Sequence, residues 1–332
     1  MSDSLSVLMP VYNEAAHLHA TIQALVEAVE QSEFVVELVV VDDGSTDGCA
    51  EVVRSALANR LPLRVLSQPN RGRFEARKAG LNAARGEWVL LLDGRVRLRP
   101  GGLEFVRAQL ESGAGASVWN GHVHVDSHDN PYGAFGDVLV SVAWKRYFDN
   151  PKTTSYGLED FDHYPKGTGC FLAPRNVLLE ALASFETSYT TSRSASDDTK
   201  LIRAIAAGRR INVSPSFACD YVPRDTLSAF VRNGVYRGAT FLDGHGHRDS
   251  RFFPVILAFY PISVALLLVS IRRPKVAVVF AAATVGTAAA VAVRARRSLF
   301  QIASFAVLTP VYAVAHGIGM WRGLAMLLAR RS

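Results

Sequence analysis

Short apolar runs alternate with segments of helical periodicity in the first part of the chain. The runs at 6–10, 34–41, 63–66 and 88–92 predict strands, and apolar residues recur at helical spacing over 15–31. Strands that alternate with helices in this way predict a doubly wound α/β sheet with parallel strands. Trp88–Leu92 is apolar at every position, which is typical of a strand buried on both faces, so we expect it to be central in the sheet.

Acidic residues directly follow two of these strands. Asp42 and Asp43 follow the second run, and Asp93 and Gly94 follow the fourth. Carboxyl ends of parallel strands share one edge of the sheet, and ligands bind at that edge in open α/β folds. We therefore expect these carboxylates to surround one crevice, although Asp93 and Gly94 alone would also suit an ordinary surface turn.

Arginines accompany these acids in Asn70–Arg73 and at Arg77. Carboxylates accept hydrogen bonds from a base or ribose and hold cations, while guanidinium groups bind phosphate, so the combination suits a nucleoside diphosphate. The sequence contains neither a Gly-x-Gly-x-x-Gly motif after the first strand nor a Gly-x-x-x-x-Gly-Lys motif. Nicotinamide dinucleotide folds and P-loops are therefore disfavoured.

The chain of 332 residues is basic, with a formal net charge of +6. From the positions of the basic residues we expect phosphate-bearing substrates and anionic lipid as partners, and no nucleic acid. The widely spaced Cys49, Cys170 and Cys219 predict reduced thiols in the core. Residues 1–6 lack the features of a cleavable signal peptide, so we expect the amino-terminal part to stay in the cytosol.

Three apolar segments follow: Phe252–Ile271, Val276–Val293 and Ser298–Gly319. At about 1.5 Å per residue, each is long enough to cross or nearly cross a bilayer core. Because they lack a polar face, they predict two or three membrane helices rather than a soluble helical core. Both links and the tail are basic, so the positive-inside rule gives no orientation. An interfacial or re-entrant position for one segment stays an alternative.

A histidine-containing strand is predicted within Val118–Asp129. On a strand, His122, His124 and Asp126 share one face at the spacing of a metal site. The alternative, which we favour, is an ordinary half-buried strand with Val123 and Val125 inside and the polar side chains in water.

Four motifs in the first ninety or so residues resemble, in order, the amino-terminal half of a family 2 glycosyltransferase. They are Val7–Glu14, Val39–Asp47, Asn70–Gly86 and the strand ending at Asp93. The resemblance implies the GT-A fold, which is a doubly wound mixed α/β sheet that binds nucleotide-diphospho-sugars. It also implies a set of nucleotide-sugar-binding residues: Pro10, Tyr12, Glu14, Asp42, Asp43, Arg73, Arg77, Asp93 and Arg95.

The sequence departs from the family at Asp93-Gly94-Arg95, where the family usually has Asp-x-Asp. The later aspartate of that motif binds Mg²⁺ or Mn²⁺, and an arginine cannot ligate a cation. Either Asp93 holds the metal with other groups, or Arg95 itself supplies positive charge to the phosphates. The resemblance therefore leaves a divalent cation as a possible cofactor.

Later motifs resemble the acceptor half of the same family. Gly167–Arg175, which includes Gly169, is similar to the floor of the acceptor site, and Ser196–Leu201 is similar to the family's Glu-Asp motif at a helix start. The resemblance implies that Asp198 takes the proton of the acceptor hydroxyl, with Asp197 beside it. Acidic residues at a helix amino-terminus, which complement its dipole, are the alternative reading.

The stretch from Tyr221 to Arg251 resembles the family's interfacial helix, in which Tyr236 and Arg237 would approach donor and acceptor. The Gln-x-x-Arg-Trp form of processive synthases is absent, which favours addition of one sugar over polymerisation. The arginines of this stretch would equally serve as anchors to anionic headgroups.

These observations predict three regions. Residues 1–220 form a cytosolic GT-A domain, with a nucleotide-binding half (1–115) and an acceptor half (116–220). Residues 221–251 are interfacial, and 252–332 form a membrane region. The expected activity is inverting transfer of a sugar from a nucleotide-sugar donor to a lipid-linked or cell-envelope polysaccharide acceptor, by a multi-pass protein of the cytoplasmic membrane. Two alternatives stay open: a polyprenyl-phosphate glycosyltransferase and a non-catalytic nucleotide-sugar-binding membrane subunit.

Overall fold

The computed structural model describes residues 4–113 and 117–331, which divide into two compact units. The sheet unit comprises Met1–His124, Arg146–Glu186 and Asp197–Val222. The helical unit comprises Val125–Lys145, Thr187–Ser196 and Pro223–Ser332. Two short segments of the expected acceptor half, 125–145 and 187–196, therefore belong to the helical unit.

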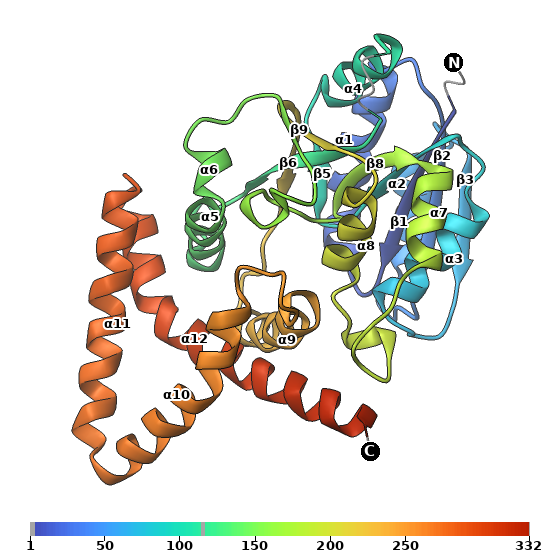
Figure 1. The fold of residues 1–332 in the computed structure, drawn as a ribbon. Helices are drawn as coiled ribbons and strands as arrows, with labels where there is room; N and C mark the ends of the chain where they lie inside the picture. The colour runs from blue at the N-terminus through green and yellow to red at the C-terminus, as the bar shows by residue number, and fades with distance from the viewer. Residues whose placement is uncertain (1–3, 114–116, 332) are drawn as a thin grey trace. The chain divides into compact units, whose positions relative to one another are not determined.

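The first half of the sheet unit has the alternating pattern that the sequence predicts (Figure 1). Its parallel strands lie in the order β3-β2-β1-β4, and the strand bounds are β1 (Ser4–Val11), β2 (Val35–Asp42), β3 (Leu63–Ser67) and β4 (Trp88–Leu92). The helices between them are α1 (Ala15–Glu30), α2 (Cys49–Leu57) and α3 (Arg73–Ala83). Val11 pairs with Asp42 in register, so the carboxyl ends of β1 and β2 lie at the same edge.

The second half of the sheet is antiparallel, which makes the sheet mixed rather than all parallel. In the described residues the order continues from β4 through β8 (Cys170–Pro174), β6 (Trp119–Val125), β9 (Ile211–Tyr221) and β5 (Val96–Leu98), with β7 (Thr154–Tyr156) beside β9. β8 runs antiparallel to β4. Further helices of this half are α4 (Gly102–Glu111), α6 (Lys145–Phe148), α7 (Arg175–Ala183) and α8 (Asp197–Ala206).

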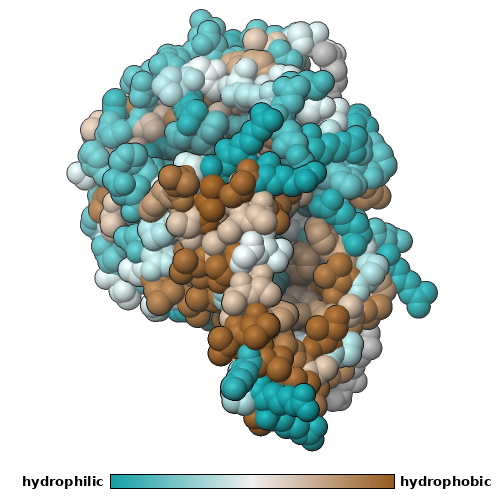
Figure 2. Space-filling model, turned by 90° about the vertical axis from the view of Figure 1, so that its left-hand side faces the viewer, coloured by the Kyte–Doolittle hydropathy of each residue, from teal (hydrophilic) through white to brown (hydrophobic). Residues whose placement is uncertain are grey.

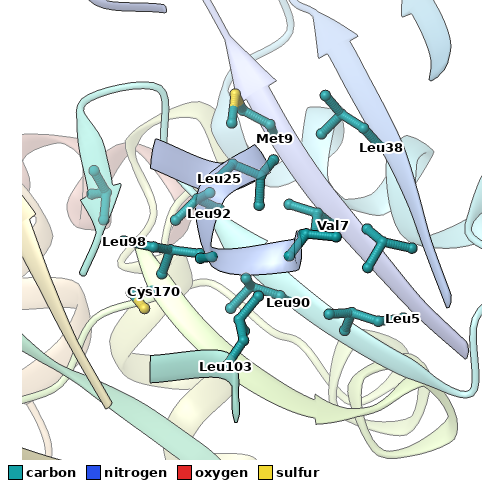
Figure 3. Close-up of a cluster of buried hydrophobic side chains, with 14 of the residues drawn as sticks. Leu5, Val7, Met9, Leu25, Leu38, Leu90, Leu92, Leu98, Leu103 and Cys170 are labelled. Carbon is teal, nitrogen blue, oxygen red and sulfur yellow. The ribbon is translucent and has the colours of Figure 1, made fainter. Parts of the chain in front are cut away.

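Two apolar layers cover the faces of the sheet. On β1, Leu5, Val7 and Met9 pack in one cluster with side chains of α1, α2 and α4 (Figure 3), whereas Leu8 packs in the other with side chains of α3, α7 and α8. This alternation follows from the period of two in a strand. All five residues of β4 are buried, as expected for a central strand.

The helical unit contains three helices long and apolar enough to cross a membrane: α10 (Phe253–Arg272), α11 (Pro274–Arg294) and α12 (Leu299–Arg331). The first two lie within two residues of their expected bounds, whereas α12 runs beyond the expected end at Gly319. Large apolar side chains are exposed along all three, and Figure 2 shows them gathered on the outside of this unit. Such an outer surface is suited to lipid rather than water.

Two further helices complete this unit. α9 (Leu227–His245) lies in the expected interfacial stretch, and α5 (Pro131–Ala143), which the sequence analysis did not identify, packs Phe135 and Val138 against Phe230 and Phe305. Its start is well specified, because the side chain of Asn130 caps its first backbone N–H groups and proline occupies the first turn.

Candidate active site at the sheet edge

The loops after β1 and β2 are joined by side-chain to backbone hydrogen bonds. Asn13 Oδ1 accepts from the Thr46 N–H at 2.9 Å, and Asp47 Oδ2 accepts from the Ala15 N–H at 2.8 Å. Burial raises the pKa of Asp47, but hydrogen bonds from Cys49 and from the Ala15 backbone outweigh this effect, and the net result is a lowered pKa. Asp47 is therefore held ionised at the start of α1.

Asp43 holds the loop after β3. Its side chain is buried, with 4% exposure, and Oδ1 accepts from Gln68 Nε2 at 2.7 Å and the Arg71 N–H at 2.8 Å. Oδ2 accepts from the Gly72 N–H at 2.8 Å. Gly44 is needed beside it, because its φ is +81° and a Cβ there would lie 2.9 Å from the Asn70 nitrogen. Both oxygens of Asp43 thus bind the chain itself.

The other expected nucleotide-side residues are more accessible. Tyr12, directly after β1, is 48% exposed, and Pro10 at the end of β1 is half-buried. Arg73 is the first residue of α3 and is exposed. Asp42 is also half-buried and accepts from the Ser45 N–H at 2.8 Å. This side of the sheet edge can meet a ligand.

Arg77 joins the end of β4 to the start of α8. Its side chain is 5% exposed, and Nη2 lies 3.0 Å from Asp93 Oδ1 while Nη1 binds Asp197 Oδ2. Asp93 and Asp197 are far apart in the sequence, and the sheet and α8 bring them to one guanidinium group. A buried charge of this kind is stable only when it is paired, and here two carboxylates pair with it.

The floor beside Asp93 is the segment that precedes β8. The Asp93 N–H donates to the Gly169 carbonyl at 2.9 Å, and a Cβ on Gly169 would lie 3.2 Å from Asp93 Oδ2. The absence of a side chain at residue 169 therefore keeps space around this carboxylate oxygen.

Asp198 differs from its neighbour Asp197 in exposure. Asp197 is 6% exposed and bound to Arg77, whereas Asp198 is half-buried and its Oδ1 accepts from the Thr199 N–H at 2.7 Å. Both stand in the first turn of α8, where the helix dipole favours negative charge. Of the pair, Asp198 is the carboxylate that solvent or a substrate can reach.

Arg95, at the position of the family's second aspartate, is neutralised by Glu14. Arg95 Nε lies 2.5 Å from Glu14 Oε2, and the two side chains are 16% and 18% exposed. This ion pair ties the loop after β1 to the loop after β4. The described residues contain no cluster of three or more His, Cys, Asp or Glu side chains that could hold a metal.

The histidines of β6 do not form such a cluster either. His122 is buried rather than in water: its Nδ1 lies 2.7 Å from the Tyr147 hydroxyl, and its ring contacts that of His124. Burial, with smaller effects of His124 and Arg99, lowers the pKa of His122 to about 4. The three cysteines are free and buried, as expected for core thiols.

Tyr236 and Arg237 lie on α9 in the helical unit, where Arg237 is exposed and Tyr236 is half-buried. The same helix also contacts the segment 187–196, which directly precedes Asp197 and Asp198. Asp243 Oδ1 and Oδ2 accept from the backbone N–H groups of Ser188 and Ser196, each at 2.8 Å. Ser196 directly precedes Asp197 in the chain.

The ion pairs of Arg77 and the hydrogen bonds to Asp243 were not predicted from the sequence. Arg77 was expected at the nucleotide-sugar, and Asp243 had no expected role. An aspartate directly after the apolar Phe241 and Leu242 was the available signal for Asp243. Nothing local marks the partners of Arg77, because they come from distant strands and helices.

Residues 6–169 match the family model described as glycosyl transferase family 2. An undecaprenyl-phosphate 4-deoxy-4-formamido-L-arabinose transferase of Aeromonas hydrophila is 37% identical over 99 residues, which are 29% of this chain and 30% of that protein. The transferase of that name from Pseudomonas aeruginosa is 28% identical over 183 residues, which are 54% of this chain and 49% of that protein. The chain thus spans less than half the length of either relative.

The fold is shared with solved structures. The mannosyltransferase PcManGT of Pyrobaculum calidifontis, solved with GDP-Man and Mn²⁺, aligns with a TM-score of 0.55 at 19% identity, over 94% of this chain and 86% of that one. At 19% identity the similarity between the two structures concerns the fold alone. This structural similarity confirms the GT-A architecture that the sequence motifs imply.

Proposed function

Because residues 6–169 belong to glycosyl transferase family 2, we propose that this protein is an inverting glycosyltransferase that moves a sugar from a nucleotide-sugar donor to a lipid-linked or cell-envelope polysaccharide acceptor. We place the reaction at the cytoplasmic membrane, with the sheet unit in the cytosol. The observation that carries the proposal is the bridge from Arg77 to Asp93 and Asp197, which sets the acidic pair at the edge of the sheet where parallel strands end.

In this proposal the donor nucleotide lies against the loops after β1 and β2. Tyr12 and Pro10 offer an exposed ring and an apolar surface to the base, and Asp42 accepts from the base or ribose. Asp43 acts indirectly, since its hydrogen bonds keep the 68–72 loop in place. Arg73 at the start of α3 is the basic side chain assigned to the diphosphate.

Asp198 is assigned as the general base. Inverting transfer needs a carboxylate that takes the proton of the acceptor hydroxyl while the anomeric carbon is attacked from the face opposite the leaving nucleotide. Asp198 is accessible, whereas Asp197 is occupied by Arg77 and positions its neighbour. Gly169, Tyr236 and Arg237 are assigned to the acceptor side.

Replacing Asp198 by Asn tests this assignment. The substitution keeps the shape but removes the base, so turnover should fall by about 10²–10⁴-fold. Nucleotide binding, measured as the rise in melting temperature with a panel of nucleotide sugars, should stay unchanged. Turnover equal to that of the unaltered protein would remove Asp198 as the base.

A divalent cation at Asp93 fits the side chains present. Mg²⁺ commonly binds through one or two carboxylates together with substrate phosphates, and Asp93 Oδ2 has space beside Gly169. Arg95 brings no net charge, because Glu14 neutralises it. When bound, the cation would screen the charge that develops on the leaving diphosphate.

We expect a chelator to lower transfer by about 100-fold or more and Mg²⁺ or Mn²⁺ to restore it. The measurement is donor turnover with and without chelator, with the melting temperature as a control for folding. Full activity in chelator would contradict an essential cation. Arginine side chains would then supply the positive charge that stabilises the leaving diphosphate.

A polyprenyl phosphate acceptor is the second candidate, and the names of the two curated relatives favour it. A phosphate is already ionised at neutral pH and needs no strong base. The Asp198→Asn variant therefore separates the candidates: its transfer to a hydroxyl acceptor should be lost, while transfer to polyprenyl phosphate should be nearly unaffected. Each acceptor is assayed with the same donor.

A further inference from the structure

The two ends of α12 are fastened to two short segments of the helical unit. Near its start, Gln301 Nε2 donates to Asp137 Oδ2 at 2.7 Å, and Arg297, just before the helix, lies 3.4 Å from the same oxygen. Asp137 belongs to α5. Near the other end, Arg330 Nη1 donates to the Thr187 carbonyl.

Both segments leave the sheet unit and return to it. Residues 187–196 form an insert of 10 residues, and 125–145 form one of 21 residues, 13 of them helical in α5. Because both ends of each insert are joined to the sheet unit, the chain must extend outward and return. The farthest point of the 10-residue insert can therefore lie at most about 17 Å from the sheet unit, and that of the 21-residue insert about 24 Å. The hydrocarbon core of a bilayer is about 30 Å thick. Neither insert can therefore lie across the membrane from the sheet unit.

The middle of α12 packs along α9. A Cβ on Gly238 of α9 would lie 2.0 Å from the His316 carbonyl oxygen, and one on Gly319 would lie 2.1 Å from the Val235 carbonyl oxygen, so the two backbones touch. α9 is not among the helices apolar enough to span a membrane, and it exposes Arg232 and Arg237. This part of α12 therefore lies at the depth of a surface helix.

α10 and α11 are different. Both have a mean hydropathy of 2.3. The first half of α10 contacts α12, through Ile256 and Tyr260, and in Figure 1 the link between α10 and α11, Arg272–Lys275, lies away from α12. The chain enters α10 beside α5, since Arg251 Nη2 donates to the Ala143 carbonyl at 3.3 Å. It leaves α11 at Arg297, which is also beside α5. The hairpin thus starts and ends on one side.

We propose that the protein crosses the membrane twice, through α10 and α11, and that α12 lies in the membrane surface on the side of the sheet unit. Its lipid-facing stripe has a seven-residue spacing, with exposures from 41% to 66%: Phe300, Val307, Val314, Trp321 and Leu328. The exposed Arg322 and Arg330 would meet anionic headgroups. The partner of this surface is the bilayer itself.

In this topology the basic residues are distributed unequally between the two sides of the membrane. The sheet-unit side then carries the link Arg294–Arg297 together with Arg322 and Arg330, whereas the opposite side carries only Arg272–Lys275. The excess of arginine places the sheet unit in the cytosol by the positive-inside rule.

Cysteine labelling in sealed vesicles tests the topology without reference to activity. Single cysteines replace Glu51 in the sheet unit, Arg273 in the first link and Arg296 in the second, and one is added after Ser332. The unaltered chain, whose cysteines are buried, serves as the blank. With a membrane-impermeant maleimide, the cysteine after Ser332 should react from the same side as Glu51→Cys and Arg296→Cys, and Arg273→Cys from the other. Reaction of the added cysteine from the Arg273→Cys side, or of all four from one side, would overturn the proposal.

Depth measurements sharpen the result. A fluorophore at Val314→Cys, near the middle of α12, should be quenched most by a lipid spin label near the headgroups, whereas Ala283→Cys, near the middle of α11, should be quenched most by a label deep in the acyl chains. Equal deep quenching at both positions would make α12 a third span and refute its surface position. Loss of transferase activity in any variant leaves these readouts unchanged, so this proposal and the proposed function fail separately.

Discussion

Two groups of acidic side chains at the same sheet edge are used in opposite ways. After β2, Asp43 is buried and its oxygens accept hydrogen bonds from the backbone of Arg71 and Gly72. Where β4 and α8 meet, Asp93 and Asp197 are instead paired with one guanidinium group. The first arrangement satisfies neutral N–H donors and builds a loop. The second balances charge and leaves Asp198 accessible beside it.

An acidic motif therefore does not by itself mark a residue that touches a ligand. Where backbone N–H groups converge on a carboxylate, the carboxylate organises the chain. Where a buried arginine converges on two carboxylates, removal of any member leaves an unbalanced charge. Substitutions in the two groups should therefore differ in size and in what restores them.

The largest effect is expected from Arg77→Met. The apolar side chain leaves Asp93 and Asp197 without their shared partner, and the free energy of unfolding should fall by about 3–5 kcal/mol. Chemical denaturation measured by circular dichroism gives this value. Adding Asp197→Asn to the variant should recover part of the loss, because one unpaired charge is removed. A double variant no more stable than Arg77→Met alone would show that Arg77 acts through packing only.

A smaller effect is expected from Asp43→Ala. The change leaves the Arg71 and Gly72 N–H groups without their acceptor, at a cost of about 2–3 kcal/mol in the free energy of unfolding. Asp42→Ala is the matched control, since its carboxylate accepts one hydrogen bond, from Ser45, and should cost about 1 kcal/mol. Nucleotide binding should weaken in both variants. Equal unfolding energies would mean that the loop does not depend on Asp43.

The smallest effect concerns His122, which is buried without an ion pair. Its pKa falls from 6.5 to about 4 in the folded protein, so folding favours the neutral ring. The stability it contributes is complete above pH 6.5 and is lost as the pH falls toward 4. Between pH 7 and pH 5 the free energy of unfolding should drop by about 1–2 kcal/mol more in the unaltered protein than in His122→Gln. Parallel pH profiles would show that His122 is not responsible.

The parallel half of the fold was predictable because its signals are local. The apolar run of β4 and the polar residues after it specify a buried strand and a ligand-facing edge within a few residues. The antiparallel pairing of β8 with β4 was not visible in the pattern, since Cys170–Pro174 is equally apolar in either direction. α5 was missed because its apolar residues serve a partner, Phe305, far along the chain.

The sequence allowed the residues of the candidate site to be predicted. The contacts among those residues were harder to predict. The accessibility of Asp198 beside a buried Asp197 depends on Arg77, and Arg77 reads in sequence like any helical arginine. The pairing of Arg95 with Glu14 likewise joins two loops that no spacing rule connects. Charge pairing over long sequence separations is decided by topology, which a local pattern does not contain.

The hydrogen bonds from Ser188 and Ser196 to Asp243 mean that the residue directly before the acidic pair is held by α9, a helix that follows it by some forty residues in the chain. A truncated protein that ends before α9 would leave the N–H groups of Ser188 and Ser196 without this acceptor. Detergent or nanodisc preparations of the whole chain are therefore the appropriate material for activity measurements, because a fragment without α9 would lack the acceptor of these two N–H groups.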